Sequence, residues 1–164
     1  MKGDAERVEH AKWLFERTLG WIAAADAKVG VTMALDTAML GGLATAFAAS
    51  DAAARTAWCY LTLLLACGAM AIAVFCAGMA AVPRMLGPVS SLIFFSRISE
   101  MAGVDYSTAF RNMTESAFLD DLTTQIHRNS EIAAEKHAWV RRSLLWSFFG
   151  AIPWIAAVAM LVKL

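Results

Sequence analysis

Charged residues are scarce in this sequence, and that scarcity excludes most soluble folds. Asp, Glu, Lys and Arg make up 17% of the 164 residues, hydrophobic residues make up 59%, and the mean hydropathy is +0.55. A soluble domain usually has about 25% charged residues. The composition therefore predicts an integral membrane protein.

Motifs for catalysis and metal binding are missing as well. The three histidines do not combine with a nearby Cys, Asp or Glu at the spacing of a metal site. Cys59, Cys67 and Cys76 lie in one apolar run without paired spacing, so we expect small buried hydrophobic residues. The sequence contains neither a Gly-rich phosphate loop nor a nucleophile elbow. We therefore predict no enzyme, no catalytic residue, no metal and no cofactor. The net charge of +0 by itself says nothing about nucleic acid, and we expect no nucleic-acid partner.

Three apolar runs have the length that a membrane helix needs, which is roughly 20 residues. They cover residues 29–49, 57–82 and 143–162. Only residues 50–56 separate the first two runs, so we expect an antiparallel hairpin. Pro153 lies in the third run and can bend that helix, because proline removes one backbone hydrogen bond.

An amphipathic helix is predicted before the first run. Its apolar residues recur at helical spacing: Val8, Ala11, Phe15, Leu19 and Ile22. Charged residues occupy the region where a signal peptide would have its apolar core, so we expect this segment to remain in the mature protein. No proline separates it from the first run, and the helix can continue into the membrane.

The basic residues predict the orientation of the chain. Of the 14 Lys and Arg residues, twelve precede the first run or lie between the second and third, which leaves Arg55 and Lys163 on the other side. Because basic residues are enriched in cytoplasmic loops, we expect the N-terminus and residues 83–142 in the cytoplasm, with residues 50–56 and Leu164 outside.

Residues 83–142 are expected to form a small helical cytoplasmic module. We predict a short helix over residues 90–101 that ends at Gly103, a second one capped by Asp105 or Ser107, and a long helix capped by Thr114. The predicted fold is all-α integral membrane, with three transmembrane helices and this module. Its four parts are residues 1–28, 29–82, 83–142 and 143–164.

The long helix carries an unusual polar face that runs without a break into the third span. At about 100° per residue, one narrow stripe contains Leu122, Gln125, Asn129, Ile132, Lys136 and Trp139. The amides can recognise a nucleobase edge and the amine can hold a phosphate. Alternatively, the stripe is a polar seam that sets helix register, and spacing alone favours that alternative.

Other residues have two interpretations each. Phe94 and Phe95 beside Arg97 can be core residues next to an exposed charge, or a stacking platform next to a phosphate contact. Asp36 lies within the first span, where a carboxylate normally faces a protein interior or water. It can line a conducting path or switch helix packing, or it can snorkel or bond to a Ser or Thr of a neighbouring helix.

Three sequence segments together resemble a known family, the small transmembrane effectors of bacterial Pycsar anti-phage defence. They are ADAKVG at residues 25–30, SLIFFSRI at residues 91–98 and DLTTQIHRNSEIAAEKHAWVRRS at residues 121–143. The resemblance covers most of the chain in the right order. The sequence departs from the family pattern at Asp36, where an uncharged amide is expected.

The resemblance implies an effector that senses cyclic CMP or cyclic UMP from a partner pyrimidine nucleotide cyclase. The response would impair the bacterial inner membrane and cause abortive infection, and we expect a homo-oligomer in the lipid bilayer. Under this hypothesis Lys136 and Arg97 bind the phosphate, and Asn129 and Gln125 bind the base or ribose. Phe94 or Phe95 stacks on the base, and the family motif adds Asp26 and Lys28. The alternatives are a small channel or transporter subunit without a nucleotide ligand, and a membrane adaptor.

Overall fold

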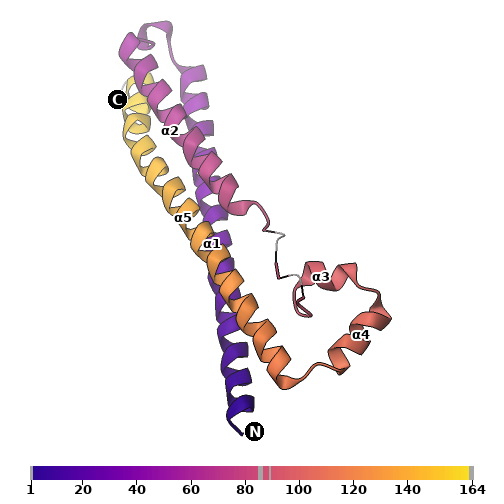
Figure 1. Cartoon of the computed structure of the whole chain (residues 1–164). Coiled ribbons are helices and arrows are strands. Elements are labelled where there is room, and N and C mark those ends of the chain that lie inside the picture. The colour runs from indigo at the N-terminus through magenta and orange to yellow at the C-terminus, as the bar shows by residue number, and fades with distance from the viewer. Residues whose placement is uncertain (1, 85–86, 89, 163–164) are drawn as a thin grey trace. The chain divides into compact units, whose positions relative to one another are not determined.

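The computed structural model describes residues 2–84, 87–88 and 90–162, and the described chain is helical with no strand (Figure 1). Its elements are α1 (Lys2–Ala49), the 3-10 helix η1 (Ala52–Ala54), α2 (Ala57–Ala81), α3 (Phe95–Glu100), α4 (Gly103–Arg111) and α5 (Glu115–Val162). The all-α prediction is confirmed. Three of the helices, α1, α2 and α5, are long and apolar enough to cross a membrane. The predictions for Lys163 and Leu164 lie outside the described residues.

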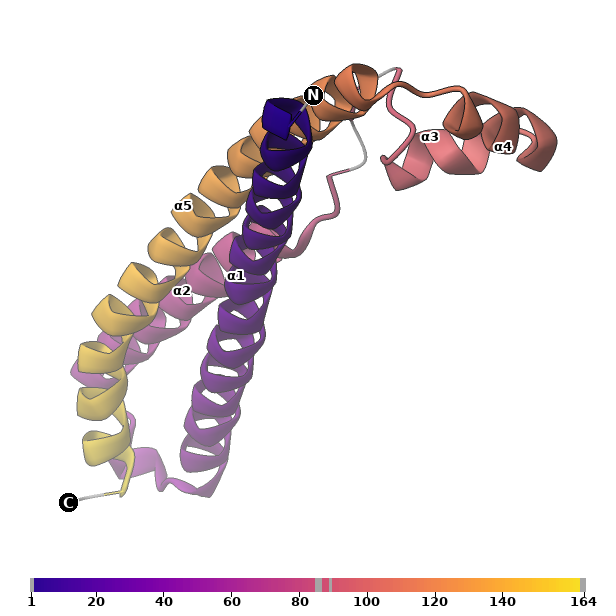
Figure 2. The same ribbon diagram turned by 90° about the horizontal axis from the view of Figure 1, so that it is seen from below.

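The chain divides into two compact units. The first consists of residues 1–24 and 83–135, and the second consists of residues 25–82 and 136–164. Both long helices, α1 and α5, pass from one unit into the other without a break, as Figures 1 and 2 show. The first unit also contains α3 and α4, and the second contains η1 and α2.

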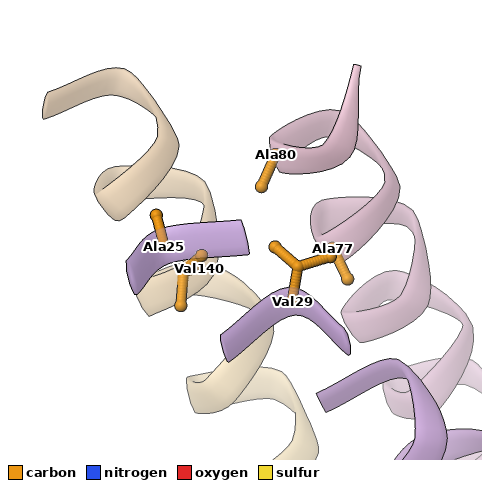
Figure 3. Packing of buried hydrophobic residues seen from close by; sticks show 5 residues of the cluster. All are labelled: Ala25, Val29, Ala77, Ala80 and Val140. Carbon is orange, nitrogen blue, oxygen red and sulfur yellow. The ribbon is translucent and has the colours of Figure 1, made fainter. Parts of the chain in front are cut away.

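The second unit is a bundle of three helices with two apolar clusters. One cluster joins Ala25 and Val29 of α1 to Ala77 and Ala80 of α2 and Val140 of α5 (Figure 3). The other lies nearer to η1, and its buried members are Leu43, Cys59, Ala66, Ala157 and Leu161. The apolar side chains on the outer surface of the bundle are exposed, as expected for helices that face lipid.

Small residues allow α2 to approach its neighbours closely. The buried face of α2 carries Ala66, Ala69, Ala73, Ala77 and Ala80, which recur every three or four residues. Small side chains are typical of helix contacts in lipid, where close packing holds helices together. The expectation for the cysteines is wrong at one position: Cys59 and Cys76 are buried, but Cys67 lies on the exposed side of α2.

Arg55 closes the connection between α1 and α2. Its guanidinium donates hydrogen bonds to the carbonyl oxygens of Phe47, at 3.1 Å, and Ser50, at 2.9 Å, and it lies 4.5 Å from the centre of the Phe47 ring. These hydrogen bonds pair the Ser50 carbonyl oxygen and add to the bonds that the Phe47 carbonyl oxygen accepts from the N–H and the hydroxyl of Ser50. The Thr56 hydroxyl then accepts the Cys59 N–H and caps α2.

The first unit differs from the prediction in its short helices. The helix expected over residues 90–101 begins only at Phe95, because the Ser91 hydroxyl accepts the N–H groups of Ile93 and Phe94 and holds that segment in a turn. Gly103 does not end this helix but begins α4, whose cap, Ala102, makes no side-chain bond. The predicted cap of α5 is confirmed, since the Thr114 hydroxyl accepts the Ala117 N–H.

The inward face of α1 also differs from the prediction at one position. Val8 and Ala11 are buried as expected, but Leu19 is 44% exposed and the neighbouring Thr18 is fully buried. The Thr18 hydroxyl donates to the Phe15 carbonyl oxygen within its own helix, at 2.7 Å, so its burial leaves no polar group unpaired.

Candidate functional site

The polar face of α5 lies against other segments of the protein. Leu122, Gln125, Asn129, Ile132 and Lys136 are each at most 9% exposed. The helical spacing therefore identified an inward face correctly. Because an unpaired polar group loses free energy on burial, the partners of the buried amides and of the amine determine what this face can do.

Gln125 takes its partner from the segment before α3. Its side-chain amide donates to the Ser91 hydroxyl oxygen at 2.9 Å, and both residues are buried. One helical turn earlier, the Asp121 carboxylate accepts the Leu92 N–H at 2.8 Å. The Tyr106 hydroxyl donates to the Leu92 carbonyl oxygen at 3.2 Å and so ties α4 to the same point. These bonds fix the turn that precedes α3 on the surface of α5.

The aromatic pair and Arg97 form the outer part of this unit. The rings of Phe94 and Phe95 lie 5.0 Å apart at 60°; the Phe94 ring rests on the backbone of Gly87, and Phe95 is 59% exposed. Arg97 pairs with Glu100 on its own helix and remains partly exposed. An exposed ring next to a half-exposed guanidinium is accessible to a ligand without unfolding of the unit.

Asn129 differs from Gln125 in having no side-chain hydrogen bond to any of the residues that the structure describes, although it is only 9% exposed. Its amide offers two donors and an acceptor. Asn129 therefore retains unused hydrogen-bonding capacity on the inward face of α5.

Lys136 belongs to the second unit and pairs with Asp26 of α1. The two sides of the pair differ in burial, since the Lys136 side chain is 8% exposed and that of Asp26 is 48% exposed. Lys28 lies on an exposed side of α1, and its carbonyl oxygen accepts the Thr32 hydroxyl. The ammonium group of Lys136 is thus held inside the unit by a carboxylate that solvent can reach.

Within the second unit, Asp36 of α1 is completely buried and bonds to α5. The Ser147 hydroxyl donates to its Oδ2 at 3.0 Å, which matches the expectation of a bond to a neighbouring Ser or Thr. The carboxylate Oδ1 has no hydrogen-bond partner among the described residues. A carboxylate within a membrane costs at least about 2.5 kcal/mol on insertion scales, so this group destabilises the bundle as it stands.

An open cavity of about 430 Å³ in the first unit does not coincide with the predicted site. Its lining includes Ser90, Leu92, Asp120, Asp121 and Thr124, and it contains none of the eight predicted binding residues. Two carboxylates next to a cavity oppose the entry of an anion. The cavity therefore does not suit the phosphate of a nucleotide.

The structure distributes the eight predicted residues between the two units. Phe94, Phe95, Arg97, Gln125 and Asn129 belong to the first, whereas Asp26, Lys28 and Lys136 belong to the second. Polar contacts also join the three sequence segments of the family resemblance. Residues 91–98 meet residues 121–143 through Ser91 and Gln125, and residues 25–30 meet them through Asp26 and Lys136.

Sequence reasoning missed Ser91 and Asp121 as parts of this site. A signal for Ser91 was present, because serine hydroxyls often accept backbone N–H groups two or three residues later in a turn or a helix cap. Asp121 gave no such signal, since its partner is a backbone N–H 29 residues away in sequence. No group of three or more His, Cys, Asp or Glu side chains in the described chain could hold a metal ion.

Comparison with protein families gives a match over most of the chain. A family model described as Pycsar effector protein domain, PycTM, matches residues 10–163 of the 164-residue chain. None of the curated proteins compared with the chain matches it, and none of the solved structures does.

Proposed function

This chain belongs to the Pycsar effector protein domain family, and on that basis we propose that it is an anti-phage defence effector. In this proposal it senses a cyclic pyrimidine nucleotide, cyclic CMP or cyclic UMP, that a partner cyclase makes during infection. Binding then impairs the bacterial inner membrane, and the cell dies by abortive infection. The role requires no catalysis by this chain.

The observation that supports the proposal best is the continuity of α5. A single helix from Glu115 to Val162 carries the buried Gln125, Asn129 and Lys136 and then becomes the third membrane-spanning candidate. A helix transmits a displacement along its axis because its backbone bonds form one continuous ladder. A ligand that binds the polar face more tightly in one helix position than in another would therefore shift the spanning segment as well.

The ion pair between Lys136 and Asp26 suggests how a phosphate would be sensed. A cyclic nucleotide carries one negative charge, which can replace the Asp26 carboxylate on the Lys136 ammonium group. One negative group replaces another beside Lys136, so the local charge is unchanged, and the ion pair that links α1 to α5 at this position is broken. Water can solvate the released Asp26 carboxylate, because this side chain is already 48% exposed.

The remaining predicted residues would complete recognition. Asn129 offers an amide without an intramolecular partner among the described residues, and the Gln125 amide would exchange Ser91 for the base or ribose. Phe94 or Phe95 would stack on the base, and Arg97 would leave Glu100 for the phosphate. Lys28, exposed on α1, would add positive charge near Asp26.

Location and assembly are part of the same proposal. The distribution of basic residues supports a multi-pass protein of the inner membrane with its N-terminus and residues 83–142 in the cytoplasm, where the nucleotide is made. We propose a homo-oligomer, because three spans are too few to enclose an aqueous path of any width.

Nucleotide binding to purified protein in detergent tests the proposal. Isothermal titration with cyclic CMP and cyclic UMP, and with cyclic AMP as a purine control, should detect binding of at least one pyrimidine nucleotide. Lys136→Ala and Asn129→Ala should each weaken it, because losing a hydrogen bond to a charged group costs about 1.5 to 3 kcal/mol, or about ten- to a hundredfold in affinity.

The matched control is Arg141→Ala, which removes an exposed positive charge from the same helix. It should leave the affinity within about threefold of the parent value, since exposed charges contribute little. If no pyrimidine nucleotide binds, the sensing function is wrong. If binding occurs but Lys136→Ala and Asn129→Ala bind like the parent, the face of α5 is a structural seam and the pocket is elsewhere.

A further inference from the structure

Asp36 is a buried acid that the proposed sensing mechanism does not use. It is a fully buried residue of α1 that bonds to α5, and its Oδ1 has no hydrogen-bond partner among the described residues. Its one partner is shared: the Ser147 hydroxyl lies 3.0 Å from Asp36 Oδ2 and 3.1 Å from the Ser143 carbonyl oxygen. A hydroxyl has a single proton, so Ser147 can serve only one of these oxygens at a time.

The surroundings of Asp36 contain oxygen ligands and no cation. The three apolar runs, residues 29–49, 57–82 and 143–162, contain no Lys, Arg or His, and Asp36 is their only charged residue. One helical turn away on each helix are the buried hydroxyls of Thr32 and Ser143, and the latter donates to the Ala73 carbonyl oxygen of α2 at 2.8 Å. Carboxylate, hydroxyl and carbonyl oxygens together are ligands that hard cations prefer.

We infer that Asp36 makes the impaired membrane selective for cations, so that small monovalent cations such as K⁺ cross it in preference to anions. The inference rests on the proposed function, because it describes what passes when the effector impairs the membrane. Water that entered the seam of Thr32, Asp36, Ser143 and Ser147 would solvate the unpaired oxygen of Asp36. The carboxylate would then stand as a fixed negative charge beside the path, as acidic residues do in cation channels.

The closed bundle explains why the resting protein would not conduct. Beyond Asp36, towards η1, the interior is apolar and contains Leu43, Ala66, Ala157 and Leu161. An apolar constriction of this kind excludes water and ions until the helices separate. The effector would therefore need the helix displacement of its active state before Asp36 could meet a permeating ion.

Basic residues near the ends of the spans do not cancel this preference. Lys28, Arg141 and Arg142 are exposed, and Arg142 lies over the Trp139 ring at 4.5 Å. Solvent and salt screen such charges strongly, whereas a charge within the span acts through a medium of low dielectric constant. Asp36 is the charged side chain that a permeating ion would approach most closely.

Ion flux from liposomes that contain the full-length purified protein tests the inference. Vesicles loaded with KCl would receive cyclic CMP or cyclic UMP, and K⁺ and Cl⁻ release would be measured with ion-selective electrodes. With sodium gluconate outside, entering Na⁺ balances the charge of the departing K⁺, and the parent should release K⁺ at least about tenfold faster than Cl⁻. Asp36→Asn should bring the two permeabilities close together, and Asp36→Glu should keep the preference for K⁺.

Asp36→Asn keeps an oxygen that can accept from Ser147, and circular dichroism with vesicle flotation would verify that both variants fold and insert. Comparable K⁺ and Cl⁻ release by the parent, or an unchanged preference in Asp36→Asn, would overturn the inference while the effector function stands. The parent measurement alone is decisive if a variant fails to fold. No nucleotide-dependent release of either ion from the parent would overturn both the inference and the membrane-impairing function.

Discussion

The unequal burial of Lys136 and Asp26 predicts that their ion pair responds asymmetrically to mutation. The side chain of Lys136 is 8% exposed and that of Asp26 is 48% exposed. Asp26→Asn leaves a buried ammonium group without a carboxylate, whereas Lys136→Met leaves a half-exposed carboxylate that water can solvate. Although Lys136 is the more buried residue, replacing its partner should therefore be the more damaging change.

The expected size follows from two limits. Breaking a fully buried pair costs about 3 to 5 kcal/mol, and an exposed pair contributes about 0 to 1 kcal/mol. Asp26→Asn should fall between these limits, at about 1.5 to 3 kcal/mol, because only one side of the pair is buried. Lys136→Met should cost less than about 1 kcal/mol, since an apolar chain of similar length fills the same space.

Thermal unfolding in detergent, followed by far-ultraviolet circular dichroism, measures the difference. One kcal/mol corresponds to about 2 to 4 °C for a domain of this size, so Asp26→Asn should lower the Tm by about 3 to 12 °C and Lys136→Met by less than about 4 °C. The double variant should resemble Lys136→Met, because the unpaired ammonium group is then absent. A Tm for Lys136→Met equal to or below that of Asp26→Asn would refute the reasoning.

Two further predictions concern the first unit. Ser91→Ala removes the acceptor of the Gln125 amide and of two backbone N–H groups, so it should lower the free energy of unfolding by about 1 to 3 kcal/mol, measured by thermal unfolding. Ser91→Thr keeps the hydroxyl and should lower the free energy of unfolding less. Equal losses in the two variants would mean that the hydroxyl does not stabilise this turn. Gly87→Ala would place a Cβ against the Phe94 ring and should speed amide hydrogen exchange in α3, whereas Gly103→Ala, whose Cβ would meet no described atom within 4 Å, should not.

Helical periodicity was sufficient to predict the face of α5 but not its partners. The spacing of Leu122, Gln125, Asn129 and Lys136 places them on one side of a helix whatever lies against it. The contacts from this face to Ser91 and Asp26 span 34 and 110 residues of sequence. No local pattern encodes such a pairing, because it depends on which helix the fold brings alongside.

The short elements between α2 and α5 were predicted less well, for a physical reason. Helices of six and nine residues are too short to be stable through propensity alone, so side-chain bonds determine where they begin. The bonds of Ser91 delay the start of α3, although the sequence around it is compatible with an earlier start. At Thr114 the side-chain cap and the helical pattern agree, and there the predicted start of α5 is correct.

Polarity, rather than hydrophobicity, indicates the inward faces of the membrane-spanning candidates. Lipid is as apolar as a protein core, so burial gains little from an apolar side chain there. Leu35 and Phe148 accordingly face outward at 52% and 72% exposure, whereas Thr32, Asp36 and Ser147 are almost fully buried. Thr32 and Asp36, like Ser143 and Ser147, are four residues apart and share a helix face. These two polar pairs mark the place where α1 and α5 meet, although Thr37 and Thr45 in the same run are exposed. Hydropathy alone predicts only that both helices span.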